Sequence, residues 1–285
     1  MKRPAFYSVY TEKSGEKGPK RRGGPQTRRF NWEERDMLLE QGERLEPLGK
    51  ELSVIVCKEH GFGTDAILLA HFSRPGPKER AVELGTGCGV ISLLWCREYR
   101  PAAITAVELQ QRACQMARRS VEGNGLSHCI QVVQEDLRNL KGTVPFGAFD
   151  VAACNPPYQP LNSGPTNPDP ARCTARHEAA CTIGEVTRAA AGLLRFSGRL
   201  CLCQRPERLC DVLEAMRQSG IEPKRLRLVQ QRPEKAPKLF LVEGKKGARP
   251  GGLVVLPTLF IEDGQGGYSR EMREIYGDYR KEGTK

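Results

Sequence analysis

The sequence predicts a doubly wound α/β fold. Short apolar runs typical of strands alternate with segments typical of helices between residues 52 and 154. A glycine-rich stretch, Glu83-Leu84-Gly85-Thr86-Gly87-Cys88-Gly89, joins one of these strands to the next helix. Polar side chains close four successive strands, at Glu83, Glu108, Asp136 and Asn155. Doubly wound sheets bind ligands at the carboxyl ends of their strands, so we expect a site where these residues meet.

The segment before the glycine-rich stretch predicts one strand and one helix. Leu52–Cys57 is rich in β-branched residues, and His60-Gly61 marks a turn. The apolar run Ala66–Phe72 predicts a helix. Thr64 or Asp65 could cap this helix by accepting from its free backbone amides.

The glycine loop matches neither of two common nucleotide-binding patterns. A dinucleotide fingerprint would need its third glycine at Val90, and no Gly-Lys-Ser/Thr follows to make a Walker loop. The remaining interpretation is a loop whose glycines lack side chains, so that a ligand can lie against its backbone. Glu83 at the strand end suits a cationic ligand better than a pyrophosphate.

The next strand, Ile104–Val107, ends in Glu108. This acid follows the loop by about 20 residues, where doubly wound folds place the carboxylate that binds a ribose diol. A third strand, Ile130–Val133, ends near Asp136 and Leu137. The intervening helix has one apolar face, made by Leu109, Ala113, Met116, Ala117 and Val121.

The short strand Phe149–Cys154 ends in Asn155-Pro156-Pro157-Tyr158. The two prolines fix φ and remove two backbone donors, so the chain leaves the strand stiffly with its carbonyls available. The Asn155 amide oxygen and the Pro156 carbonyl can accept both N–H bonds of a planar amine while Tyr158 stacks on it. Two such acceptors favour the pyramidal nitrogen that attacks. A single Asn-Pro is usually a plain turn, but these four residues after a glycine loop favour chemistry.

A long loop, Gln159–Arg176, follows and is rich in Pro, Asn and Gly. Arg172, Arg176 and His177 at its exit could bind substrate phosphates or could anchor the loop. Further along, Thr182 and Glu185 form a capping-box pattern before a helix at 183–194. Strands are expected at 199–203, 225–230 and 238–242, and a further one at 253–261. Between the last two, Gly244–Arg249 predicts a basic loop tip.

Composition excludes several classes of protein. The eleven cysteines include no C-x-x-C pair, which is typical of free thiols in a reducing cytosol. The histidines lack the spacing of metal ligands, so no metal is expected. No stretch has the length of a membrane span, and the amino terminus lacks the apolar core of a secretory signal. The sequence therefore predicts a cytoplasmic protein without a metal site or membrane contact.

These motifs, in this order, resemble the class I S-adenosylmethionine-dependent methyltransferases that modify a planar NH₂ group. More narrowly, the chain resembles the bacterial tRNA1(Val) (adenine-37) N6-methyltransferase family. The resemblance spans roughly residues 52–276 and is carried by four segments: Phe62–Ala66, Glu83–Gly89, Asn155–Tyr158 and Ala175-Arg176-His177-Glu178. Residues 1–30, which are rich in Lys and Arg, depart from the compact pattern of that family.

The resemblance implies a seven-stranded, mostly parallel sheet with a reversed hairpin, formed by residues 31–285. It implies methyl transfer to the N6 amine of an adenine in tRNA. The implied catalytic residues are Asn155, Pro156, Pro157 and Tyr158. The implied cofactor-binding residues are Phe62, Gly63, Thr64, Asp65, Glu83, Gly85, Gly87, Gly89, Glu108, Asp136, Leu137 and Asn155. The expected substrate contacts are Tyr158, Arg172, Arg176, His177, Lys245, Lys246 and Arg249.

Residues 1–30 predict a disordered basic tail. They contain nine Lys or Arg and two Glu, and so carry +7 of the net charge of +11. Such a tail either keeps the protein soluble or binds phosphates, and an RNA substrate favours the second use. Residues 31–50 are expected to form a short helix or a linker into the domain.

Three other functions share some of these features. Glutamine methylation of a release factor uses a similar N-P-P-Y, but the helical substrate domain that usually accompanies it is not visible in residues 1–50. DNA adenine methylation usually brings a target-reading domain, for which little chain remains. A non-catalytic RNA-binding protein on the same fold would not need an intact N-P-P-Y.

Overall fold

The computed structural model of the chain describes residues 38–49, 51–156 and 181–279. The predicted basic tail, residues 1–30, and the whole of the predicted loop Gln159–Arg176 lie outside these ranges. Of the predicted site residues, five therefore have no structural description here: Pro157, Tyr158, Arg172, Arg176 and His177.

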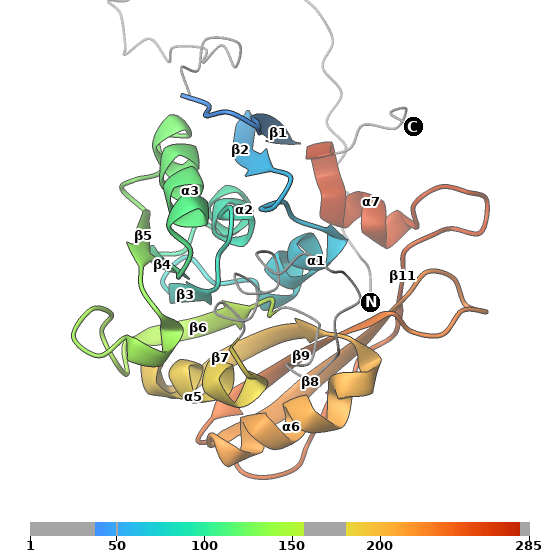
Figure 1. Cartoon of the computed structure of the whole chain (residues 1–285). Helices are drawn as coiled ribbons and strands as arrows, with labels where there is room; N and C mark the ends of the chain where they lie inside the picture. Colours follow the sequence, from blue (N-terminus) through green and yellow to red (C-terminus); the bar gives the residue numbers. More distant parts are fainter. Residues whose placement is uncertain (1–37, 50, 157–180, 280–285) are drawn as a thin grey trace, which may run out of the picture.

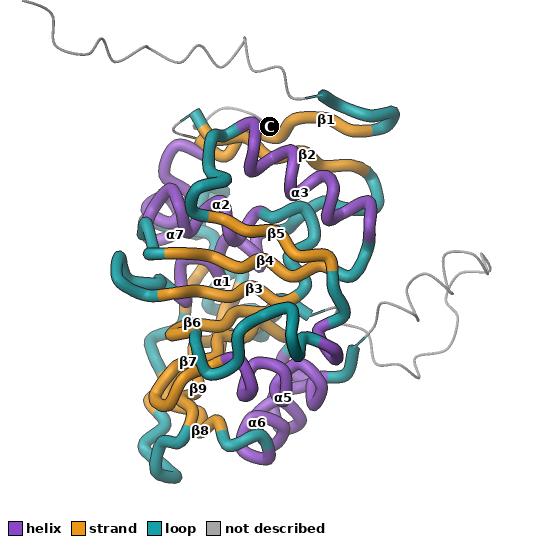
Figure 2. Tube along the Cα trace, turned by 90° about the vertical axis from the view of Figure 1, so that its left-hand side faces the viewer, coloured by secondary structure: helices purple, strands orange, loops and turns teal. Residues whose placement is uncertain are grey.

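The predicted doubly wound, mostly parallel sheet is confirmed (Figures 1 and 2). Its seven long strands lie in the order β5-β4-β3-β6-β7-β9-β8. Among these, β9 runs antiparallel to both of its neighbours, which makes the reversed hairpin at one edge. Two short strands, β10 (Val254–Val255) and β11 (Leu259–Phe260), pair with β8 beyond that hairpin. The long strands are β3 (Arg80–Leu84), β4 (Ala103–Glu108), β5 (Ile130–Gln134), β6 (Phe149–Cys154), β7 (Leu194–Gln204), β8 (Ile221–Gln230) and β9 (Leu239–Lys246).

Helices cover both faces of the sheet because its central strands are apolar on both sides. In β6, Val151 and Ala153 face one hydrophobic cluster and Ala152 and Cys154 face the other. The first cluster is covered by α1 (Thr64–Ser73), α2 (Val90–Glu98), α3 (Gln111–Gly123) and α7 (Arg270–Tyr276). The second is covered by α5 (Ile183–Leu193) and α6 (Leu209–Gln218), and 3₁₀ turns occur at η2 (Leu137–Asn139), η3 (Pro206–Arg208) and η4 (Gly277–Tyr279).

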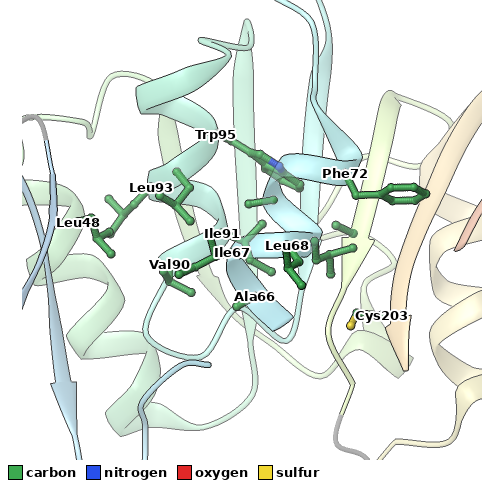
Figure 3. Packing of buried hydrophobic residues seen from close by; sticks show 14 of the residues in the cluster. Leu48, Ala66, Ile67, Leu68, Phe72, Val90, Ile91, Leu93, Trp95 and Cys203 are labelled. Atoms are coloured by element: carbon green, nitrogen blue, oxygen red, sulfur yellow. The ribbon is translucent and has the colours of Figure 1, made fainter. Parts of the chain in front are cut away.

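The first helices are buried on nearly all sides, as expected for helices without a polar face. In α1 every residue from Ala66 to Ala70 is buried, and in α2 the whole run Val90–Cys96 is buried. Figure 3 shows side chains of both helices in one cluster with Leu48 and Cys203. The indole N–H of Trp95 donates to the Ser73 hydroxyl over 2.9 Å, so this deeply buried polar group is satisfied.

The expectation of a helix or linker at 31–50 is wrong for the residues that the structure describes. Residues Glu43–Gly49 form strand β1, which pairs antiparallel with β2 (Leu52–Cys57) in a separate two-stranded sheet. Arg119 of α3 donates to both carboxylate oxygens of Glu43, each over 2.8 Å. The charged residues of this segment bind a charged side chain of α3, and its extended conformation is set by pairing with β2.

Three smaller expectations also need correction. Leu109 lies before α3, which begins at Gln111, and it is 38% exposed, so it is not part of the buried face. Residues 244–246 belong to β9, so the basic loop tip is limited to the turn after Lys246. The strand expected at 253–261 is two pieces of two residues each.

The ten cysteines within the described ranges are free thiols, most of them buried. Within the same ranges, no cluster of three His, Cys, Asp or Glu side chains could hold a metal ion. A search of the described helices found none with the length and apolar character needed to cross a membrane.

Phe149, at the start of β6, offers a direct test of the core that α5 and α6 cover. It is 1% exposed, and its truncation to Ala should lower the free energy of unfolding by about 3–5 kcal/mol through lost burial and a new cavity. Phe196 is 74% exposed and provides the matched control, whose truncation should cost about 0.5 kcal/mol or less. Urea unfolding of both variants measures this, and equal losses would contradict the packing described.

Candidate active site

The register of the parallel strands brings the predicted strand-end residues to one edge of the sheet. Leu84 of β3 pairs with Val107 of β4 and with Cys154 of β6. Gly85, Glu108 and Asn155 each come directly after one of these paired residues, so they share one end of three adjacent strands. The amides of Gly85 and Thr86 both donate to the Val107 carbonyl over 2.9 Å, which ties the start of the glycine loop to β4.

Two of the loop glycines border open space. Gly85 and Gly87 have φ of +71° and +55°, and a Cβ on either would meet no protein atom within 4 Å. Gly89 is different, because a Cβ there would lie 3.3 Å from the Cβ of Ala117 in α3. Gly85 and Gly87 therefore leave room for a ligand against the backbone, whereas Gly89 lets the start of α2 pack on α3.

Glu108 lies against the glycine loop. One carboxylate oxygen accepts from the Gly87 amide over 2.7 Å, and the other accepts from the Gln110 amide over 2.8 Å. The residue is 7% exposed. Each carboxylate oxygen can accept a second hydrogen bond, so two ribose hydroxyls could still bind there. The bond to Gly87 joins the two sequence motifs and was not foreseen from their spacing.

Glu83 lies behind the loop instead of lining it. Glu83 is 2% exposed. One of its carboxylate oxygens accepts from both the amide and the hydroxyl of Ser92, over 2.9 and 2.5 Å. Burial raises the pKa of Glu83 to about 7. Glu83 thus connects the strand before the loop to the first turn of α2. A contact of Glu83 with the cofactor remains a prediction.

The raised pKa of Glu83 predicts a pH dependence of stability. The pKa of Glu83 is about 7 in the folded protein and 4.5 ordinarily. The contribution of Glu83 to the free energy of unfolding is therefore complete below pH 4.5 and is lost as the pH rises through 7. In Glu83→Gln the side chain stays neutral and can still accept from Ser92. The wild-type unfolding free energy should therefore fall relative to the variant by on the order of 3 kcal/mol between pH 5 and pH 8.

Urea unfolding of both proteins across this range measures the difference, because the other carboxyl groups contribute equally to each. Parallel stability profiles would show that Glu83 is not held in its neutral form.

Asp136 is engaged by a neighbour. Its carboxylate caps η2 by accepting from the Arg138 amide over 2.9 Å, and it forms an ion pair with the Arg138 guanidinium at 2.6 Å. Hydrogen bonding to Arg138 lowers the pKa of Asp136. The cofactor contact that the resemblance implies for Asp136 would have to share this carboxylate with Arg138. Leu137 packs on the cluster beneath α5.

Asn155 contacts the start of α1. Its amide Nδ2 donates to the Asp65 carboxylate over 2.8 Å, across 90 positions of sequence. The N-cap of α1 is Gly63, and no side chain caps that end of the helix. The expectation that Thr64 or Asp65 caps α1 is therefore wrong, because Asp65 is turned toward Asn155.

Tyrosines from the far end of the chain hold this segment in place. The hydroxyls of Thr64 and Tyr276 share a hydrogen bond of 2.8 Å. The ring of Phe62 lies 6.0 Å from that of Tyr279, which in turn stacks 5.6 Å from Tyr276. Sequence reasoning missed these tyrosines, since nothing local connects them with residues more than 200 positions earlier.

His60 is a second residue that the motifs did not indicate. It follows β2, and burial lowers its pKa, an effect that the negative charge of Glu108 opposes.

Three of the expected substrate contacts lie at the opposite end of the sheet. Lys246 Nζ donates to the Leu194 carbonyl over 2.7 Å, and Leu194 pairs with Phe149, the first residue of β6. Lys245 pairs with Arg199 beside it, and the Arg249 carbonyl accepts from Lys224 over 2.7 Å. Asn155 follows the last residue of β6, so the length of that strand, roughly 17 Å, separates the two groups.

The fold and the comparisons with known proteins define a class of enzyme. Residues 53–165 match the family model described as "Methyltransferase small domain". The crystal structure of a predicted O-methyltransferase, Atu636 of Agrobacterium tumefaciens, covers 76% of this chain and 97% of its own with a TM-score of 0.63. At 22% identity that likeness concerns the fold alone. The chain is a methyltransferase with the class I fold, which implies S-adenosylmethionine as cofactor.

Within that class the chain is related to the tRNA1(Val) (adenine(37)-N6)-methyltransferases, and the resemblance drawn from its motifs is confirmed. The enzyme of that name from Porphyromonas gingivalis strain ATCC 33277 is 28% identical over 220 residues, which is 73% of this chain and 84% of the relative. The one from Parabacteroides distasonis is 26% identical over 223 residues, covering 76% of this chain and 89% of the relative.

Glu108 provides a test of the cofactor pocket. Glu108→Ala should weaken binding of S-adenosylmethionine by about 1.5–3 kcal/mol, because the ribose loses a charged acceptor. Glu122→Ala, at an exposed position of α3, should leave the affinity unchanged and serves as the control. Calorimetric titration of both folded variants measures this, and an unchanged affinity in Glu108→Ala would mean that the acid only supports the loop.

Proposed function

We propose that the protein transfers a methyl group from S-adenosylmethionine to the exocyclic N6 amine of an adenine in tRNA. The observation that carries this proposal is the position of Asn155. Its amide closes β6 next to the strand that leads into the glycine loop, and a hydrogen bond to Asp65 fixes it there. The choice of tRNA adenine as the target is taken from the related enzymes, which are named for adenine 37 of tRNA1(Val).

The residues present fit the cofactor. Open space above Gly85 and Gly87 admits a ligand against the backbone, and Glu108 offers a carboxylate at the same edge. Leu137 and the segment Phe62–Asp65 would border the remaining sides. When bound, S-adenosylmethionine supplies a methyl group activated by its sulfonium charge.

The chain's own contribution is to hold the target amine. The amide oxygen of Asn155 and the carbonyl of Pro156 can each accept one N–H of the amine. Both acceptors draw the hydrogens out of the ring plane, which returns the lone pair to the nitrogen that attacks. This help is given mainly in the transition state. No strong base is required, because the proton can leave after the nitrogen has become cationic.

An RNA substrate agrees with the charge of the protein. The net charge of +11 favours a polyanion, and an adenine can be splayed from a single-stranded loop at low cost. Lys245, Lys246 and Arg249 lie far from Asn155, so in this proposal they contact a distant part of a large RNA. Such a substrate implies a cytoplasmic enzyme.

Asn155→Ala tests the chemistry. Turnover should fall by about 2.7–4 kcal/mol of transition-state stabilisation, or 10²–10³-fold, while cofactor affinity stays near that of wild type. Asn139→Ala, at an exposed position of η2, is the matched control and should keep full activity.

The assay offers labelled S-adenosylmethionine with separate pools of tRNA, ribosomal RNA, DNA and release factor. Labelled N6-methyladenine in tRNA supports the proposal. Label in the glutamine of a release factor, in DNA, or in none of the pools would overturn it.

A further inference from the structure

We propose that Asp65 is a positioning residue that decides which end of the Asn155 amide faces the substrate. This inference rests on the proposed function, in which the amide oxygen of Asn155 accepts from the target amine. The Asp65 carboxylate has no donor hydrogen when ionised, so it can bind only the NH₂ end of that amide. The bond from Asn155 Nδ2 to Asp65 Oδ2 is 2.8 Å long.

The contact removes an ambiguity that the amide itself leaves open. The two ends of an asparagine side chain have nearly the same shape, and a rotation of 180° about χ2 exchanges them. In the wrong orientation Asn155 would present N–H groups to an amine that also carries N–H groups. A charged acceptor beside Nδ2 makes that orientation unfavourable, and the oxygen is turned away from Asp65.

The shape of the chain around Asp65 supports this role. Gly63 lies in an extended conformation with φ of −115°, which any residue could adopt. A Cβ at Gly63 would nevertheless lie 2.5 Å from Asp65 Oδ1, so the carboxylate occupies the space that a side chain there would need. A side chain at Gly63 would therefore require the Asp65 carboxylate to shift.

The segment that carries Asp65 is fixed from outside the family-matched region. Tyr276 of α7 is 2% exposed and shares a hydrogen bond with Thr64, the residue before Asp65. Residues 53–165 match the methyltransferase family model, so this tyrosine is supplied by a later part of the chain. Asp65 is also the second residue of a helix in which every residue from Ala66 to Ala70 is buried. The carboxylate is therefore held on a rigid element.

A swap of the two side chains gives the sharpest test. Asp65→Leu removes the acceptor at similar size, and kcat at saturating S-adenosylmethionine should fall about 10- to 100-fold. Asn155→Asp alone sets two carboxylates against each other and should be at least as impaired. In the double variant Asp65→Asn with Asn155→Asp, the donor moves to position 65 and an acceptor oxygen remains at 155. Its kcat should exceed that of Asn155→Asp by about tenfold or more.

Two further variants complete the series. Gly63→Ala should displace the Asp65 carboxylate and reproduce part of the loss in kcat at saturating S-adenosylmethionine. Asp211→Asn, at an exposed position of α6, should be silent. A loss of cofactor affinity in Asp65→Leu with kcat retained at saturation would show that Asp65 binds the cofactor, and would overturn the inference. Failure of the swap to restore activity over Asn155→Asp would also overturn it.

A spectroscopic measurement separates this inference from the proposed function. In protein labelled with ¹⁵N at asparagine, Asn155→Asp identifies the side-chain NH₂ signals of Asn155. One of these protons should lie downfield in the wild type and move upfield in Asp65→Leu, whether or not a substrate is known. If the signals do not move, the positioning role fails even for an active methyltransferase. If they move but no amine is methylated, the contact stands and the proposed function fails.

Discussion

The parallel pairing of β3 with both β4 and β6 is the constraint on which the site depends. It places the last residues of three strands in one row, so that a glycine loop, a carboxylate and an amide begin at the same edge. The loop contributes backbone beside open space, Glu108 a carboxylate and Asn155 an amide to that edge. A slip of one residue in either pairing would turn the strand faces over and separate these groups.

Two buried acids hold the glycine loop and the helix that follows it. Glu83 binds Ser92 in the first turn of α2, and Glu108 binds the Gly87 amide. Because a loop with several glycines is costly to order, such fixed acceptors are what make it a defined surface before a ligand arrives. Preorganisation of this kind lowers the free-energy cost of binding.

The sequence was sufficient for features that depend on neighbours along the chain. The strands, the glycine loop and the capping box of Thr182 with Glu185 follow from local pattern, and the structure contains them. Features set by distant partners could not be predicted. Asp65 looks like a helix cap until Asn155 is brought to it, and Lys245 looks like a loop residue until β9 is seen to run backward. Polar strand β1 is decided by its pairing with β2 in the same way.

The tyrosines of α7 and η4 have a consequence for the order in which the protein matures. Phe62 and Thr64 are synthesised early, yet the side chains that fix them, Tyr276 and Tyr279, are added more than 200 residues later. A nascent chain that has reached residue 260 already contains the glycine loop, Glu108 and Asn155, but nothing yet clamps the entrance to α1. The contacts that hold the start of α1 are therefore completed only after residues 276–279 have been synthesised.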